Sequence, residues 1–428
     1  MAKEYSSSEL EKSILKCNRC GMCQDVCPTY KITGNENDVA RSRLRLARMV
    51  IEGKHTWTDD PELMEHLNGC LLCKACVAQC PANVPTDEIV MQARLGTNRL
   101  KGLPVFNRIA YRGIFSHSKR LAVLTRVIRF YQKSGMNRVI QRSGFLNLLK
   151  KWGKAEDLLP LMPVQSLRQM LPELLKPLAT PQQRIVYFAG CAINFFYSRM
   201  GAATIQVLQA NNCEVLVPEV GCCGGPHQSG GDFEEALRLA KMNIDVILAL
   251  EPDIIISDCA TCSNVLKEYV NLLENSPDYR EKAQVFAGKS RDINEFILER
   301  QWLPATRSVH GIATYHDPCH LARGQKITKA PRQILKSIPG LEFVEMKESD
   351  MCCGGAGSYG ALQPDMSRQI LDRKIGNTLK TGANYLVTSC PSCAMQLEYG
   401  LRRHNMDAKV VHPMELLAMA YGMRSIDS

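Results

Sequence analysis

The sequence lacks the long apolar runs that mark membrane-spanning helices and secretory signals. No run of 18 or more apolar residues occurs in the 428 residues. The start of the chain, MAKEYSSSELEKSILKC, contains no apolar stretch of signal-peptide length. We therefore expect a cytoplasmic protein whose thiols stay reduced.

The fingerprints of several catalytic and nucleotide-binding sites are also missing. We find no G-x-G-x-x-G motif of a flavin or nicotinamide site, no P-loop and no Ser-His-Asp signature. We therefore expect no flavin in this chain, and we expect that it does not oxidise an organic substrate by itself.

Acidic residues are absent from residues 89–155, which contain 15 Lys or Arg residues. The formal net charge of the whole chain is +10, so the remainder is slightly acidic and the basic character belongs to this stretch. The segment RLAVLTRVIRFYQKSG within it predicts a basic amphipathic helix, and Pro160, Pro163, Pro172 and Pro177 predict a loose linker after it. Docking on an anionic membrane surface or an acidic partner is favoured over a solvated face that screens cluster charge. No nucleic-acid-binding module accompanies the charge.

Cysteine, by contrast, is abundant, with 19 residues. A disulfide framework would suit a small secreted domain, but a chain of 47.8 kDa buries enough core without one. The cysteines are therefore predicted to be metal ligands or redox groups.

Eight cysteines near the N-terminus form two ferredoxin-type runs. Residues 17–28 read CNRCGMCQDVCP and residues 70–81 read CLLCKACVAQCP, both matching C-x2-C-x2-C-x3-C-P, the run that binds a [4Fe-4S] cluster. The fourth cysteine of each run ligates the other cluster. The predicted ligand sets are Cys17, Cys20, Cys23 and Cys80 for one cluster, and Cys70, Cys73, Cys76 and Cys27 for the other. Zinc is the alternative, although it needs fewer cysteines. The 42 residues between the runs include a helical segment at 38–53, so we expect a helical variant of the ferredoxin fold.

Ten further cysteines form a pattern that occurs twice. One cysteine is followed by a CCGG pair and then by C-x2-C, with 30 and 35 residues between these groups in the first copy and 32 and 36 in the second. The first quintet is Cys191, Cys222, Cys223, Cys259 and Cys262, and the second is Cys319, Cys352, Cys353, Cys390 and Cys393. Five thiols at matched spacing predict a metal site in each copy, and zinc bound by four of them is the alternative.

Short apolar runs precede most of these cysteines and alternate with helical stretches. They predict strands at 184–191, 214–223 and 252–262 in the first copy, and at 311–319, 341–353 and 384–393 in the second. Open α/β sheets place ligands at the carboxyl ends of their strands, where these cysteines lie. We expect two similar α/β lobes related by an approximate two-fold axis.

On these motifs the C-terminal half resembles the cysteine-rich CCG family of heterodisulfide reductase catalytic subunits and of iron–sulfur subunits of flavin-dependent dehydrogenases. The whole layout resembles the iron–sulfur subunits of glycolate oxidase, lactate dehydrogenase and anaerobic glycerol-3-phosphate dehydrogenase, and also the two-module heterodisulfide reductase subunit. The resemblance implies two cubane [4Fe-4S] clusters and one or two further clusters, cubane or noncubane, in the CCG domains. The expected fold is multidomain, with a ferredoxin-type domain (1–95), a basic helical connector (96–180), CCG domain 1 (181–305) and CCG domain 2 (306–428).

The resemblance implies two functions. In the first, the chain is the electron-transfer subunit of an oxidoreductase complex. An FAD-containing partner oxidises a 2-hydroxy acid such as glycolate or lactate, and electrons continue to a quinone or another carrier at the inner face of the cell membrane. In the alternative, noncubane clusters reduce a disulfide, and complete quintets favour this reading.

Three residues outside the ligand sets are also singled out. His316 and His320 flank Cys319, where they are predicted to ligate metal, pass protons or donate hydrogen bonds to cluster sulfur. Cys213 lies outside every pattern and is predicted to be a core thiol.

Overall fold

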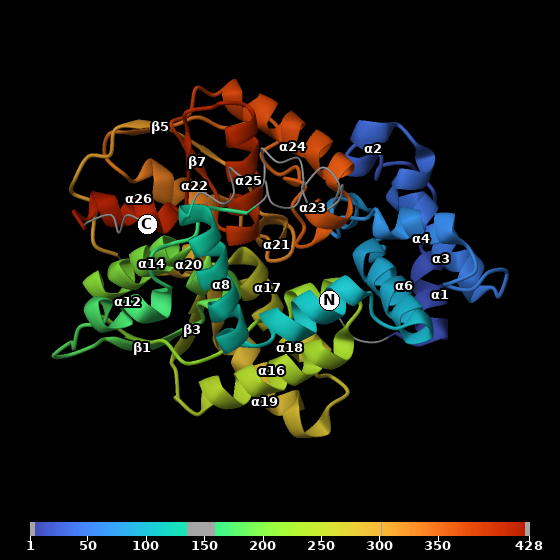
Figure 1. Cartoon of the computed structure of the whole chain (residues 1–428), viewed down its shortest axis with the longest axis horizontal. Coiled ribbons are helices and arrows are strands. Elements are labelled where there is room, and N and C mark those ends of the chain that lie inside the picture. The colour runs from blue at the N-terminus through green and yellow to red at the C-terminus, as the bar shows by residue number, and fades with distance from the viewer. Residues whose placement is uncertain (1–4, 135–158, 301, 424–428) are drawn as a thin grey trace.

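The computed structural model describes residues 5–134, 159–300 and 302–423, and these form three parts around a largely shared core (Figure 1). The first part is helical, which agrees with the expected variant of the ferredoxin fold. Ser6 and Glu9 form a capping box that starts its first helix, and Pro28 starts its second directly after Cys27. Its elements are α1 (Ser7–Leu15), α2 (Pro28–Thr33), η1 (Glu36–Asp38), α3 (Ala40–Ile51), α4 (Pro61–Asn68), α5 (Ala75–Gln79) and α6 (Thr86–Lys101).

The connector begins after α6 with α7 (Val105–Asn107), a π-helical segment η2 (Arg108–Phe115) and α8 (Ser118–Lys133). Helix α8 coincides with the predicted amphipathic helix, whereas the rest of the basic stretch, residues 135–158, lies outside the described residues. Pro172 does not break the chain as predicted, because it lies inside α12 (Leu167–Leu174). That helix buries Leu167, Met170 and Leu174 and packs against α14 (Ser198–Ala210), and this burial outweighs the lost backbone hydrogen bond.

The first lobe contains a four-stranded parallel sheet in the order β2-β1-β3-β4. The apolar runs predicted as strands form β1 (Gln183–Tyr187), β2 (Cys213–Leu216) and β3 (Ile254–Ser257), while β4 (Ser290–Asp292) is too short to have been predicted. Cys213 is buried in β2, as predicted. The helices besides α14 are α13 (Gly190–Phe195), α15 (Gly225–Ser229), α16 (Phe233–Leu248), α17 (Ala260–Lys267), α18 (Tyr269–Leu272), α19 (Pro277–Lys289) and α20 (Ile293–Leu298).

The second lobe repeats this topology, with a parallel sheet in the order β6-β5-β7-β8. Its strands are β5 (Gly311–Tyr315), β6 (Leu341–Phe343), β7 (Tyr385–Val387) and β8 (Lys409–Val411). Its helices are α21 (Cys319–Ala322), α22 (Lys329–Lys336), α23 (Tyr359–Leu362), α24 (Pro364–Leu379), α25 (Pro391–Arg403) and α26 (Pro413–Ala420). The two sheets confirm the prediction of duplicated α/β lobes.

The lobes pack closely against each other and against the ferredoxin part. Helix α14 of the first lobe lies against α26 of the second, and the Ala260 N–H donates to the Ser389 carbonyl at 2.9 Å. In Figure 1 the blue N-terminal helices lie beside the orange α23 and α24, and α2 contacts α24. The cysteine-bearing edges of all three parts therefore meet inside the molecule. Among the described residues, no helix is long and apolar enough to cross a membrane.

Candidate metal centres

The first ferredoxin-type loop surrounds a cavity lined by Cys17, Cys20, Cys23 and Cys80, the four residues predicted to share one cluster. Cys76 also reaches this cavity. Arg19 and Gly21 have left-handed backbone, with φ of 58° and 85°. Alternating left-handed residues turn backbone N–H groups toward one side of a loop, and such nests bind anionic groups, including iron–sulfur clusters.

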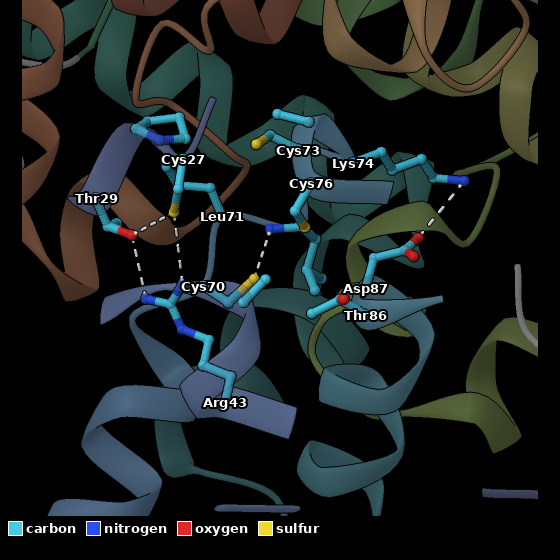
Figure 2. A pocket seen from close by; sticks show the side chains of 14 residues that line it. Cys27, Thr29, Arg43, Cys70, Leu71, Cys73, Lys74, Cys76, Thr86 and Asp87 are labelled. Carbon is cyan, nitrogen blue, oxygen red and sulfur yellow. Dashed lines mark hydrogen bonds and ion pairs between the residues drawn. The ribbon is translucent and has the colours of Figure 1, made fainter. Parts of the chain in front are cut away.

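The second loop has the same form (Figure 2). Its cavity is lined by Cys27, Cys70, Cys73 and Cys76, the other predicted ligand set. Leu72 and Lys74 take the places of Arg19 and Gly21 and also have left-handed backbone, with φ of 54° and 58°. The Leu72 N–H donates to Cys70 Sγ at 3.4 Å. A strained conformation in two non-glycine residues indicates a loop shaped around a bound group.

A buried arginine lies beside the second cavity, and the sequence did not single it out. Arg43, on α3, is 2% exposed; its Nε donates to the His66 carbonyl at 2.8 Å, and its Nη2 to Thr29 Oγ1 at 3.2 Å. Its Nη1 lies 3.9 Å from Cys27 Sγ (Figure 2). The guanidinium therefore offsets the negative charge that thiolates would bring to this site.

The first quintet gathers where three parallel strands end. Cys191 lies in the first turn of α13 after β1, Cys222 and Cys223 follow β2, and Cys259 and Cys262 flank the start of α17 after β3. Their thiols are hydrogen-bonded in one row, in the order Cys191, Cys222, Cys223, Cys262 and Cys259. The Gly224 N–H donates to Cys222 Sγ at 3.4 Å, and a left-handed φ of 89° at Gly224 makes this approach possible.

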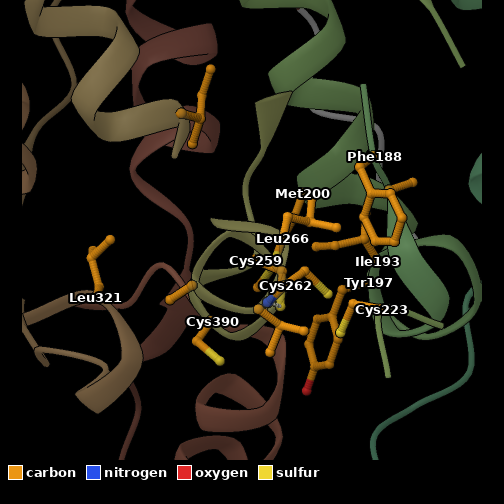
Figure 3. Close-up of a cluster of buried hydrophobic side chains, with 14 of the residues drawn as sticks. Phe188, Ile193, Tyr197, Met200, Cys223, Cys259, Cys262, Leu266, Leu321 and Cys390 are labelled. Carbon is orange, nitrogen blue, oxygen red and sulfur yellow. Dashed lines mark hydrogen bonds between the residues drawn. The ribbon is translucent and has the colours of Figure 1, made fainter. Parts of the chain in front are cut away.

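The second quintet forms a matching row, in the order Cys390, Cys393, Cys353, Cys352 and Cys319. The two rows are joined, because the thiols of Cys259 and Cys390 are themselves hydrogen-bonded. Thr261 Oγ1 lies 3.5 Å from Cys390 Sγ at the same junction, which Figure 3 shows between the two lobes. Spacing alone predicted two quintets, and the packing of the lobes brings them together.

The row ends beside the ferredoxin part. The charges of Cys319 and Cys352 interact with that of Cys73, and burial followed by the proximity of Cys352 raises the pKa of Cys73 to about 12. Arg323 of the second lobe donates to the Cys73 carbonyl at 3.3 Å. Thiols therefore extend without interruption from the second ferredoxin-type cavity through the second quintet to the first.

These thiols carry protons that a metal centre would displace. All 19 cysteines are free. Hydrogen bonds from neighbouring thiols lower the pKa of Cys223, Cys352 and Cys390, while hydrogen bonding and burial raise the pKa of Cys191 and Cys319. Buried thiols in contact can share only a few charges, and binding of cationic iron allows all of them to ionise. With the nests and glycine N–H groups, the donor set fits iron–sulfur clusters.

The two histidines lie at the second quintet. The ligand nitrogen of His316 and the sulfurs of Cys353 and Cys393 all lie within 4.8 Å of one another. His316 is buried, and no described residue makes a hydrogen bond to either of its ring nitrogens. His320 Nδ1 lies 3.7 Å from Cys319 Sγ and 3.4 Å from Thr261 Oγ1. Both histidines are therefore close enough to act on a group held by the second quintet.

The sequence matches three family models. The 4Fe-4S dicluster domain matches residues 13–84, and the cysteine-rich domain matches residues 185–267 and 313–398. The linker region of the glycolate oxidase iron–sulfur subunit matches residues 102–159. These matches give the chain multiple [4Fe-4S] clusters, and none of the matched descriptions names zinc, so the zinc alternative has no support.

Curated relatives agree with the family models. A probable glycolate oxidase iron–sulfur subunit of Bacillus subtilis is 32% identical over 433 residues, covering 99% of this chain and 97% of that protein. Lactate utilization protein A of Macrococcus caseolyticus is 32% identical, covering 55% of this chain and 96% of that protein. A subunit of the CoM/CoB fumarate reductase of Methanothermobacter marburgensis is 35% identical, covering 56% and 47%. By its full-length similarity to the first of these proteins, the chain belongs to the family of glycolate oxidase iron–sulfur subunits.

Proposed function

We propose that the chain passes electrons from a partner flavoprotein, which oxidises a 2-hydroxy acid such as glycolate or lactate, to a further carrier. The names of the relatives that are similar over nearly all of this chain or of their own length support this substrate class. [4Fe-4S] clusters accept and release single electrons. The observation that carries the proposal is the unbroken row of thiols from Cys73 to Cys191.

The ligand assignment is part of this proposal. Each ferredoxin-type cavity holds four thiols, one of them from the opposite loop, and this supports the exchanged assignment. Cys17, Cys20, Cys23 and Cys80 would hold one cubane cluster, and Cys70, Cys73, Cys76 and Cys27 the other. The quintets that contain Cys191 and Cys319 would hold one further cluster each.

We propose a division of labour among four segments of the chain. Residues 1–95 hold the cubane clusters, residues 96–180 dock to a partner or a surface, and residues 181–305 and 306–428 form the two CCG lobes. The identical strand order of the two sheets supports a relation between the lobes by an approximate two-fold axis.

The connector is proposed to rest on the inner face of the cell membrane, where electrons would pass to a quinone. Support comes from α8, which buries Leu121 but exposes Val123, Val127 and Phe130 by 58%, 59% and 67%. Lys and Arg residues accompany these apolar side chains along the helix. An exposed apolar stripe with cationic neighbours suits an anionic lipid surface.

One observation favours the alternative function, reduction of a disulfide at the CCG clusters. Both quintets are complete, and they adjoin at Cys259 and Cys390. Two centres that close could each engage one sulfur of a bound disulfide. An electron paramagnetic resonance (EPR) signal that changes when thiol or disulfide is added would favour this function.

The test of the electron-transfer function is anaerobic reduction of the purified holoprotein by the partner flavoprotein and its hydroxy acid. We expect EPR signals of reduced clusters to appear, and Cys353→Ser to lose the second-lobe signal while the ferredoxin signals remain. Cys213→Ser is the matched control, because that thiol lies in β2 outside both quintets. Clusters that stay oxidised in the presence of reduced flavoprotein would contradict the proposal.

A further inference from the structure

The two CCG lobes have the same topology but differ in the buried side chains around their thiols. Corresponding positions can be assigned directly, because β1 and β5 both end at a tyrosine, Tyr187 and Tyr315. Helices α16 and α24 both contain 16 residues and start at the same distance before the C-x2-C pair. Differences at matched positions therefore report how the two sites have diverged.

The first difference directly follows the tyrosines. The second lobe has His316, whereas the first has Phe188, and both side chains are buried. Burial lowers the pKa of His316 to about 3, so the imidazole is neutral near pH 7 and carries both a lone pair and an N–H. It contacts no hydrogen-bonding partner among the described residues and lies beside the thiols of Cys353 and Cys393. A fully buried imidazole without a partner implies a bound group at that place.

The second difference lies in the long helices behind the CCGG turns. Lys374 of α24 is fully buried, and its ammonium donates to the Glu348 and Ser349 carbonyls. The matching residue of α16 is Asn243, also fully buried, whose amide donates to the Cys222 carbonyl at 3.0 Å. Both bonds of Lys374 go to neutral oxygens, and charge interactions link it to Cys352 and Cys353. The second lobe therefore holds a cation where the first holds a neutral amide.

The third difference has the opposite sign. Asp258, directly before Cys259, is fully buried and accepts hydrogen bonds from the hydroxyls of Tyr187 and Thr204, each at 2.7 Å. The matching residue is Ser389, whose hydroxyl lies 3.0 Å from that of Tyr315. The first lobe therefore holds a carboxyl group where the second holds a neutral hydroxyl.

We propose that the second quintet holds its metal centre at a higher reduction potential than the first quintet does. Lys374 and His316 act as positioning residues that stabilise the reduced form in the second lobe, and Asp258 opposes reduction in the first. A buried cation stabilises an added electron, hydrogen-bond donors to a cluster raise its potential, and a buried carboxylate lowers it. This inference rests on the proposed function, in which both quintets hold clusters.

The order of potentials matches the order of the parts. The second lobe is the one that contacts Cys73 of the ferredoxin part, through Cys319 and Cys352. The stronger electron acceptor therefore lies next to the ferredoxin-type cavities, and its centre is reduced before that of the first lobe.

The test is an anaerobic redox titration of the isolated holoprotein followed by EPR. Cys223→Ser and Cys353→Ser, which each disrupt one quintet, assign the signals to the lobes. In the wild type we expect the second-lobe signal to appear at the higher potential. Lys374→Asn, which installs the first-lobe residue, is expected to shift that midpoint to a lower potential and leave the first-lobe midpoint unchanged. Asp258→Asn is expected to raise the first-lobe midpoint alone.

Lys380→Asn, the same charge change at the exposed end of α24, is the matched control and is expected to shift neither midpoint. His316→Phe is expected to lower the second-lobe midpoint and to remove a nitrogen hyperfine coupling from its signal. Equal or reversed midpoints in the wild type would overturn the inference even if Lys374→Asn does not fold. A protein that holds only the cubane irons would instead count against the proposed function, so the two failures are distinguishable.

Discussion

Asp292 shows at the scale of one residue how the fold tolerates a buried carboxyl group. It caps α20 by accepting a hydrogen bond from the Asn294 N–H at 2.9 Å, and it also accepts one from the Ser263 hydroxyl at 2.9 Å. Burial nevertheless raises its pKa to about 6. The group therefore loses its proton in the unfolded chain at a lower pH than in the folded protein.

The sign of the pH dependence follows from this difference. Between about pH 4 and pH 6 the unfolded state binds fewer protons at this residue, so its contribution to stability falls as the pH rises. Asp292→Asn keeps a good helix cap and does not titrate. We expect the variant to gain about 3 kcal/mol in unfolding free energy relative to the wild type between pH 4 and pH 7. Denaturant unfolding at both pH values measures this, and a difference independent of pH would contradict the raised pKa.

At the scale of structural elements, the CCGG turns place two thiols against the end of a long helix. Gly354 has φ of 88°, and a Cβ at this position would lie 2.7 Å from the Ser367 carbonyl oxygen. Gly357 has φ of 66° but nothing within 4 Å of a Cβ. The two glycines thus share a left-handed backbone and differ in the space around them.

This contrast gives a matched pair of substitutions. Gly357→Ala is expected to destabilise the protein by about 1–2 kcal/mol through its backbone conformation alone. Gly354→Ala is expected to destabilise it further and to remove the second-lobe iron, because the turn must move away from α24. Thermal unfolding and iron content measure both effects. Equal behaviour of the two variants would show that the close packing of this turn is unimportant.

The connector helix α8 makes its own prediction. The holoprotein is expected to float with vesicles that contain an anionic phospholipid and not with vesicles of a neutral phospholipid. Val127→Glu, in the exposed apolar stripe, should weaken flotation at least tenfold. Val285→Glu, at an exposed position of α19 in the first lobe, should leave it unchanged. Flotation that is unaffected by Val127→Glu would direct the search to a protein partner.

Element positions could be predicted well where sequence pattern determines them. The β-branched runs before the cysteines predicted β1, β2, β3, β5 and β7, because buried parallel strands need continuous apolar sequence. The three-residue strands β4 and β8 leave too little pattern to detect. The contacts of Arg43 and Lys374 depend on segments distant in sequence, so no local pattern indicates them. The junction of Cys259 and Cys390 depends on how two lobes pack, which spacing does not specify.

At the scale of the whole molecule, the ferredoxin part is fixed to the second lobe by polar contacts around the thiols. Lys31 pairs with Glu348 at 2.7 Å, and the Tyr359 hydroxyl donates to the Gly69 carbonyl at 3.0 Å. Arg94 joins the same part to the first lobe through the Ser229 carbonyl at 2.8 Å. These contacts hold three cysteine-bearing edges together, which is what an electron-transfer subunit requires.

The central claim is that the thiols of all three parts hold iron–sulfur clusters that act in series. Its most direct test is the iron and acid-labile sulfide content of the protein purified without oxygen. Four four-iron clusters predict about sixteen irons per chain, together with a similar number of sulfides. A protein that is fully folded and retains only about eight irons would show that the quintets hold no clusters, and would contradict the account.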